Sequence, residues 1–285
     1  MLSIFTNKSA MASMNALNRA NNSMGVAMER LGTGKRINRA ADDAAGLQIA
    51  TRLQGQFNGM ATATQNIAQS KGLLSTAEGA FEEVNNILFR MKDLATQAAD
   101  DTNGQEERKS MQSEFSELNK ELNNIMSNTS YGSEKLLRSI SGTAVSGKLS
   151  KELQFQIGAS KEEVLKVNMS TQLNDVADKL NALTAAGISG SAQAANGMLD
   201  KVNASLDSVG TMRAALGATV NRLDHTNNNL ANMKDNTDAN IGTIRDADVA
   251  AENLKMMRQS MLFQGSQAML LQSNQQAQGL LQFMK

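Results

Sequence analysis

The most regular feature of this sequence is a seven-residue spacing of apolar side chains. Between residues 43 and 99 one apolar series repeats every seven residues, and a second series of mostly small residues lies beside it. This pattern predicts a coiled-coil helix, about 85 Å long if it is continuous at 1.5 Å per residue. The main series is Leu53, Met60, Ile67, Leu74, Phe81, Leu88 and Ala95, and its companion is Ile49, Ala63, Ala77, Val84, Met91 and Ala98.

Both ends of the chain carry the same spacing, Ala10, Leu17, Met24 and Leu31 at one end and the series from Val249 to Met284 at the other. An isolated helix cannot bury such a stripe, so each terminal helix needs a partner, which is either the other terminus or another copy of the chain. The predicted assembly seams are Met14, Leu17, Met24, Met28, Leu31, Val249, Met256, Phe263, Leu270 and Met284.

Two further helical stripes occupy residues 111–125 and 199–230, with a loop predicted at residues 100–104 and a turn at 131–133. The character of the sequence changes in the middle of the chain. Residues 139–150 are rich in Ser and Gly, residues 153–158 and 165–169 alternate apolar and polar side chains as strands do, and residues 185–197 form a flexible, small-residue stretch. We therefore expect a mainly α fold, a long antiparallel coiled-coil bundle with paired terminal helices and a small β-hairpin region at about residues 139–170.

Composition supports long helices and excludes several classes of function. The 285 residues include no Pro, Cys or Trp, and only 3% are aromatic. The absence of Pro suits unbroken helices, and the absence of Cys excludes disulfides and thiolate metal sites. Lys and Arg balance Asp and Glu at 28 each, which argues against nucleic acid or an anionic membrane surface as a partner. No window approaches 18 consecutive apolar residues, and residues 1–9 lack the pattern of a Sec signal peptide.

No motif indicates catalysis. Residues 32–36 (GTGKR) lack the first Gly and the final Ser or Thr of a phosphate-binding loop and are interpreted as a turn that ends a helix. The carboxylate pairs Asp42–Asp43 and Asp246–Asp248 are explained by stabilisation of helix N-termini. His225 is the single imidazole and stands in a polar stretch, so a metal site or a Ser/His/Asp triad is not expected. We predict no enzyme activity, no metal and no cofactor.

Residues 31–46 (LGTGKRINRAADDAAG) resemble the signature of the bacterial flagellin family at Gly34, Arg36, Ile37, Asn38, Ala40, Asp42, Asp43, Ala44, Ala45 and Gly46. Residues 244–252 (IRDADVAAE) and 262–284 are similar to the C-terminal helix of that family, including its Asp246 and Asp248 entry. Residues 216–218, 221–223 and 153–169 match further family segments, so the resemblance covers essentially the whole chain. The sequence departs from the family in lacking the common Pro in the final Asn-Gln run and in its short centre, which indicates a short form without variable outer domains.

The resemblance implies a non-catalytic subunit that polymerises into an extracellular flagellar filament for motility. It implies export in an unfolded state, assembly at the filament tip, and terminal helices that become ordered only on assembly. Residues 1–42 with 246–285 would form an inner core that lines the filament channel, residues 43–245 an outer core, and the signature residues would connect the two layers. The implied partners are copies of the chain, the flagellar export machinery, an export chaperone, the filament cap and the hook-filament junction proteins.

Residues 88–97 resemble the segment that a vertebrate Toll-like flagellin receptor recognises. Leu88, Arg90, Leu94 and Gln97 match that segment, and Glu114 falls where the family places a further contact. Phe89, Lys92 and Asp93 depart from it. The alternative is a purely structural role, with Leu88 and Met91 in the bundle core and Arg90 in an intersubunit contact. Three other functions stay open at this point, namely a hook-filament junction protein or regulatory paralogue, a non-flagellar helical scaffold, and an enzyme.

Overall fold

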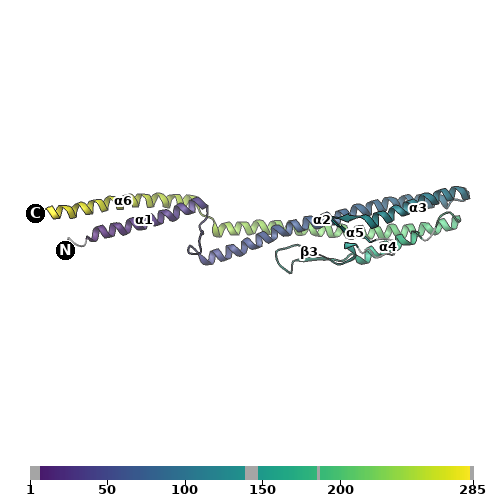
Figure 1. Ribbon diagram of the computed structural model, residues 1–285, viewed down its shortest axis with the longest axis horizontal. Coiled ribbons are helices and arrows are strands. Elements are labelled where there is room, and N and C mark those ends of the chain that lie inside the picture. Colours follow the sequence, from purple (N-terminus) through teal and green to yellow (C-terminus); the bar gives the residue numbers. More distant parts are fainter. Residues whose placement is uncertain (1–6, 139–146, 185–186, 283–285) are drawn as a thin grey trace. The chain divides into compact units, whose positions relative to one another are not determined.

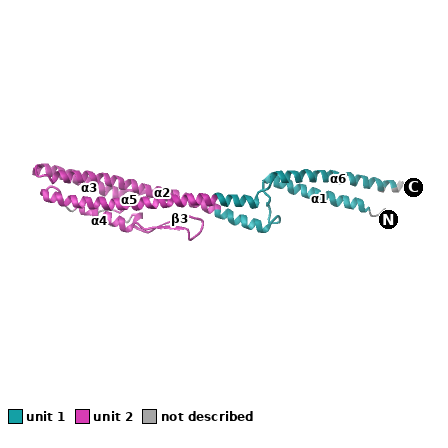
Figure 2. Ribbon diagram, turned by 180° about the vertical axis from the view of Figure 1, so that it is seen from behind, with its two compact units in different colours: residues 1–56, 235–285 teal, residues 57–234 magenta. Residues whose placement is uncertain are grey.

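The computed structural model describes the backbone of residues 7–138, 147–184 and 187–282, and the side chains of all of these except residues 277 and 280–282. The chain divides into two compact units, residues 1–56 with 235–285, and residues 57–234 (Figure 2). The described helices are α1 (Lys8–Thr33), α2 (Ala44–Ala98), α3 (Gln105–Asn128), α4 (Ser170–Thr184), α5 (Ala192–Arg245) and α6 (Val249–Gln282), with a short 3₁₀ turn at Lys148–Ser150.

In the first unit, α1 and α6 lie side by side and run antiparallel (Figure 1). Arg30, near the end of α1, forms an ion pair with Glu252, near the start of α6. At the opposite end, the side chains of Asn7 and Ser273 are hydrogen-bonded to one another. Asn7 also caps α1, because its side-chain oxygen accepts from the amide of Ala10. The predicted antiparallel pairing of the terminal helices is therefore present within a single chain.

The second unit is a helical bundle formed by α3, α4 and the parts of α2 and α5 that belong to it. Ion pairs tie α2 to its neighbours: Arg90 pairs with Glu114 of α3, and Lys71 and Glu78 pair with Asp224 and Arg213 of α5, whose reversed order shows that α2 and α5 run antiparallel. The predicted heptad positions supply the core. Every member of the main α2 series from Met60 to Ala95 is buried, as are the α5 residues Val202, Val209, Leu216, Leu223 and Leu230.

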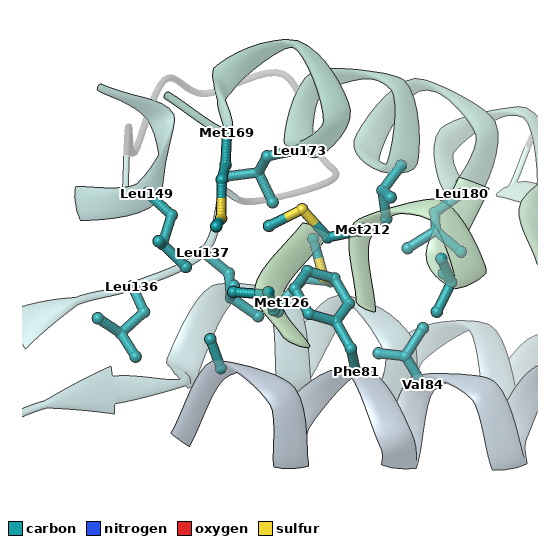
Figure 3. Close-up of a cluster of buried hydrophobic side chains, with 14 of the residues drawn as sticks. Phe81, Val84, Met126, Leu136, Leu137, Leu149, Met169, Leu173, Leu180 and Met212 are labelled. Atoms are coloured by element: carbon teal, nitrogen blue, oxygen red, sulfur yellow. The ribbon is translucent and has the colours of Figure 1, made fainter. Parts of the chain in front are cut away.

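One part of this core gathers side chains from many segments around Phe81 of α2 (Figure 3). Helix α3 contributes Met126 and α5 contributes Met212, while the segment after α3 contributes Leu136 and Leu137. Leu149 of the 3₁₀ turn, Met169 directly before α4, and Leu173 and Leu180 of α4 complete the cluster. The local, irregular elements are thus held by the same apolar core as the long helices.

Two antiparallel hairpins belong to the second unit. The larger joins β3 (Leu153–Gln156) to β4 (Val164–Val167) with Phe155 opposite Leu165, as the alternating pattern predicts. The smaller joins β1 (Ser130–Tyr131) to β2 (Glu134–Lys135) across the predicted turn, where Gly132 has a positive φ of 64° that suits glycine.

The structure confirms the fold class, with three differences in detail. Ile49, assigned to the companion series of α2, is exposed. Helix α5 begins at Ala192, inside the stretch predicted to be flexible, because Ser191 caps it by accepting from the amide of Ala194. In the Ser- and Gly-rich stretch, residues 139–146 lie outside the described residues, and Lys148–Ser150 form the 3₁₀ turn.

Candidate assembly surface and junction

The signature residues lie where α1 ends and α6 begins, in a region that we call the junction, residues 34–43 with 244–248. Helix α1 ends at Gly34, whose φ of 70° is the left-handed conformation that commonly terminates helices. The two segments then pair as backbone. The amide of Arg36 donates to the carbonyl of Arg245 at 2.7 Å, and the amide of Ala247 donates to the carbonyl of Gly34 at 2.9 Å. These bonds form an isolated antiparallel bridge between Lys35 and Asp246.

Side chains of the signature reinforce this backbone pairing. Arg36 donates to the carbonyl of Ile244 at 2.7 Å, and Asn38 donates to the carbonyl of Lys35 at 3.0 Å. Ile37 is buried at 1% exposure and packs close to Gly46, where an added Cβ would lie 2.8 Å from the Cδ1 atom of Ile37. A side chain at position 46 would therefore force Ile37 and Asp43 to shift.

Three of the acidic signature residues act on backbone amides. Oδ2 of Asp42 accepts from the amides of Arg39 and Asn38 at 2.9 and 3.0 Å, and these bonds, aided by the nearby Arg30 guanidinium, hold the pKa of Asp42 below its ordinary value. Asp43 accepts from the amide of Gly46 at 2.8 Å at the start of α2. Asp248 accepts from the amides of two alanines in the first turn of α6. Asp43 and Asp248 thus cap the N-termini of α2 and α6, as expected for acidic residues at helix starts, whereas Asp42 holds the loop that precedes α2.

Asp246 differs from the other three acidic signature residues, because within the described residues it joins the junction through its backbone and not through its carboxylate. Its backbone forms the bridge with Lys35. Its amide also donates to the carbonyl of Gly242 at 2.8 Å, which continues the hydrogen bonding of α5 to the edge of the junction.

Sequence reasoning missed the charged pair between Arg30 and Glu252. Nη1 of Arg30 lies 2.8 Å from Oε1 of Glu252, and the two side chains are only 20% and 12% exposed. Nε of Arg30 and Oε2 of Glu252 are buried without a hydrogen-bond partner among the described residues, although Lys255 lies 3.6 Å from that carboxylate. A second pair, Glu29 with Arg39, is more exposed and links α1 to the junction loop. Because 222 residues separate Arg30 from Glu252 in sequence, no local pattern reveals their contact.

The contact between α1 and α6 uses smaller side chains than the heptad analysis expected. Ala20 and Ala27 are the buried residues of α1, and Ser273 is buried in α6. The predicted seam residues Leu17, Met24, Leu31, Met256, Phe263 and Leu270 are half-buried, consistent with a place along the contact. Met14, Met28 and Val249 are exposed in the single chain, and the Met284 position lies outside the described residues. Their predicted role at seams between copies stays a prediction.

Fifteen large apolar side chains are exposed among the described residues, and eleven of them belong to α1 or α6. Monomeric proteins rarely expose apolar surface on this scale without a binding partner. We call this set the outward apolar residues: Met11, Met14, Val26, Met28, Val249, Leu254, Met257, Met261, Leu262, Met269 and Leu271.

The segment that resembles a receptor-binding site contains both buried and exposed residues. Leu88 and Leu94 are buried in the core of the second unit, as the structural alternative expects. Arg90 forms an exposed ion pair with Glu114 at 2.7 Å, and Gln97 is exposed. Phe89 is 50% exposed beside this pair. The structure thus brings Arg90 and Glu114 together on the surface and leaves the two leucines to the core.

Within the described residues, no group of three or more His, Cys, Asp or Glu side chains is arranged to hold a metal ion. None of the described helices combines the length and the apolarity that a membrane span requires. His225 is exposed, in line with its expected place on a solvated helix face.

Comparison with known proteins identifies the family. The bacterial flagellin N-terminal helical region matches residues 4–143, and the bacterial flagellin C-terminal helical region matches residues 199–284. Flagellin of Halalkalibacterium halodurans is 38% identical over 259 residues, which are 91% of each chain. The chain belongs to the bacterial flagellin family. Flagellin of Bacillus subtilis is a further relative, 37% identical over 96% of this chain and 98% of its own.

Membership of the flagellin family excludes the enzyme among the earlier alternatives. Flagellins are structural proteins, so the chain is not an enzyme. The match to polar flagellin F of Vibrio parahaemolyticus spans 374 aligned positions at 30% identity, so this chain of 285 residues is shorter than that relative. Its fold is also similar to the crystal structure of Bacillus cereus FlgL, with a TM-score of 0.52 at 20% identity over 66% of this chain and 97% of that one.

Proposed function

We infer that the chain is a structural subunit of the bacterial flagellar filament, and we propose that copies associate through the outward apolar residues of α1 and α6. The supporting observation is the concentration of eleven of the fifteen exposed large apolar side chains on these two helices. Each Leu or Met that passes from water into an apolar contact contributes roughly 1.5–3 kcal/mol. Burial of several of these residues together therefore favours association. The formal net charge of zero adds no electrostatic barrier between copies.

The experiment is a polymerisation assay with two matched substitutions. Met261→Glu places a charge on a side chain that is 67% exposed in α6, and Met233→Glu does the same at a 45% exposed site in α5, outside the outward apolar residues. We expect Met261→Glu to abolish filament formation with helical circular dichroism retained, and Met233→Glu to polymerise like the parent chain. Equal polymerisation of both variants would refute the proposed surface.

The junction is proposed to connect two layers of the filament, an inner core of residues 1–42 with 246–285 and an outer core of residues 43–245. Support comes from the backbone bridge between Lys35 and Asp246 and from the caps made by Asp43 and Asp248, which fix where α2 and α6 begin. The compact units divide elsewhere, since the first unit also takes in residues 43–56 and 235–245. The assignment of residues to layers therefore rests on the family resemblance and stays a prediction.

The route to the filament follows from the same proposal. An extracellular filament subunit of this family would use the flagellar export machinery and an export chaperone, and would meet the filament cap and the hook-filament junction proteins during assembly. The absence of Pro and Cys from the sequence suits repeated unfolding and refolding, because neither Pro isomerisation nor disulfide exchange can slow the process. Deletion of the export apparatus in the source cell should leave the chain inside the cell, and its continued appearance outside would contradict this route.

Contact with a host Toll-like flagellin receptor is proposed at Arg90 and Glu114, whose side chains form a surface ion pair. A receptor reporter-cell assay with the free subunit tests this directly. Arg90→Ala should lower the response, and a matched change in another exposed ion pair, Arg39→Ala, should leave it unaltered. If the parent chain gives no response at any concentration, the receptor is not a partner of this protein.

A further inference from the structure

The outward apolar residues are dominated by methionine. Six of the eleven are methionines, with exposed fractions between 49% and 67%. In the second unit most of the described methionines are buried, and Met233 is the exception at 45% exposure; the buried ones are Met60, Met91, Met126, Met169, Met198 and Met212. The exposed thioethers of α1 and α6, which we call the outward methionines, are Met11, Met14, Met28, Met257, Met261 and Met269.

Further methionine side chains line a hollow at the contact between α1 and α6 in the first unit. It has a volume of about 350 Å³ and is lined by Met24, Met256, Met257, Ser260 and Met261. Two of these methionines belong to the outward set, and the other two are half-buried. Small solutes thus have access both to the outer face and to the sulfur atoms next to the helix contact.

These sulfur atoms are the groups in the chain that are most reactive toward a two-electron oxidant, because the sequence contains no Cys and no Trp. With hydrogen peroxide, a lone pair on the sulfur attacks one peroxide oxygen and the O–O bond breaks. The sulfur gains an oxygen and loses two electrons, the peroxide is reduced, and water leaves. The product, methionine sulfoxide, is polar and is returned to the thioether by methionine sulfoxide reductases.

We propose that the outward methionines form a reversible oxidation site that controls assembly. The inference rests on the proposed function, in which the same side chains are covered when copies associate. Sulfoxides on this surface place polar S=O groups where apolar contacts form, so an oxidised subunit cannot polymerise until it is reduced. In the filament the same sulfur atoms are covered and protected, so oxidation acts on the free subunit. Access to them does not depend on whether α1 and α6 are folded in that subunit, since unfolding exposes them further.

The first test needs no substitution. The free subunit is treated with hydrogen peroxide until each methionine is partly oxidised, polymerisation is then induced, and filaments are sedimented. Peptide mass spectrometry measures the sulfoxide fraction at each methionine in the pellet and in the supernatant. We expect the outward methionines to be at least ~5-fold poorer in sulfoxide in the pellet than in the supernatant, because burial of the polar product is unfavourable. Equal fractions in pellet and supernatant would overturn the proposal.

The second test measures reversal and uses matched variants. Fully oxidised subunit should need at least ~10-fold more protein to polymerise than untreated subunit, as expected when several buried apolar contacts are lost. Treatment with methionine sulfoxide reductases and thioredoxin should restore the original threshold. Replacing the six outward methionines with leucine should make polymerisation resistant to peroxide. The control that replaces Met91, Met126, Met198 and Met212 with leucine should remain sensitive.

Each failure has a distinct meaning. If untreated subunit forms no filaments, the proposed function itself fails. If untreated subunit polymerises and oxidised subunit polymerises at the same threshold, only the oxidation site fails. If the sixfold leucine variant stays as sensitive as the parent chain, the relevant sulfur atoms lie elsewhere and the assignment to the outward methionines is overturned. If that variant does not polymerise at all, the sulfoxide fractions in the pellet and supernatant of the parent chain decide between the outcomes. Equal fractions then overturn the proposal, and outward methionines depleted of sulfoxide in the pellet support it.

Discussion

The ion pair between Arg30 and Glu252 offers a quantitative test of how the terminal helices are held together. Its charged atoms are 2.8 Å apart, and its side chains are 20% and 12% exposed, so it lies mostly out of water at the contact between α1 and α6. The perturbation is a double-mutant cycle in which each residue is replaced by methionine, singly and together. Methionine matches the length of glutamate, keeps most of the apolar stem of arginine, and removes the charge.

The magnitude follows from the burial of the pair. Breaking a buried ion pair by removing one partner costs about 3–5 kcal/mol, because the remaining charge is left without compensation. The partial exposure of Arg30 and the presence of Lys255 3.6 Å from Glu252 reduce this cost, and we expect about 2 kcal/mol for each single variant. That value corresponds to a rise of about 30-fold in the concentration at which subunits polymerise. The double variant removes both charges, so its threshold should return to within about 5-fold of the parent chain.

Polymerisation thresholds measured by sedimentation provide the assay, and the pair Glu29–Arg39 provides the control. Its side chains are 34% and 70% exposed, and exposed pairs contribute about 0–1 kcal/mol, so Arg39→Met should raise the threshold by no more than about 5-fold. The reasoning is wrong if the single variants at Arg30 and Glu252 behave like Arg39→Met. It is also wrong if the effects of the two single variants simply add in the double variant.

Three further predictions concern the core and the junction. Phe81→Ala should lower the free energy of unfolding of the free subunit by about 3–5 kcal/mol in urea titrations, because Phe81 is fully buried. The control Phe89→Ala, at an exposed site, should change that free energy by less than about 1 kcal/mol. Similar losses in the two variants would contradict the assigned core. Since the pKa of Asp42 is lowered in the folded state, its carboxylate stabilises the junction at neutral pH, and this contribution is lost as pH falls through that lowered pKa, below 3.8. Asp42→Asn filaments should therefore dissociate more readily than the parent filaments at pH 7 and equally readily in strong acid, whereas a difference that is constant with pH would exclude this role. Gly46→Ala should destabilise filaments by about 1–3 kcal/mol in thermal dissociation, because the new Cβ would lie 2.8 Å from the Cδ1 atom of Ile37. An unchanged midpoint temperature of dissociation would show that Ile37 moves aside without cost.

The sequence pattern was sufficient to predict the bundle of the second unit. Large apolar residues spaced by seven, such as Leu74 and Phe81, face a partner in both the pattern and the structure, because only a covered helix face can hold so many of them. The hairpin was predicted for a comparable reason, since alternation from Leu153 onward matches the period of a strand.

The same reasoning does not separate the contact within one chain from the seams predicted between copies. Heptad analysis favours large apolar residues, and it therefore placed Met14 and Met28 on the seam. The contact between α1 and α6 instead buries Ala20 and Ala27, and the two methionines point away from it. Small residues permit a close approach of two helices but are too common to mark a seam in one sequence. The pairing of Arg30 with Glu252 is hidden for another reason, because it arises only when the two ends of the chain meet.

The central claim is that this flagellin-family chain is an assembly subunit whose terminal helices associate with those of other copies. Electron cryomicroscopy of the purified protein after induced polymerisation tests it most directly. The account predicts long filaments in which α1 and α6 lie nearest the filament axis and the outward apolar residues are covered by neighbouring copies. A protein that stays monomeric, or filaments in which α1 and α6 face the solvent, would contradict it.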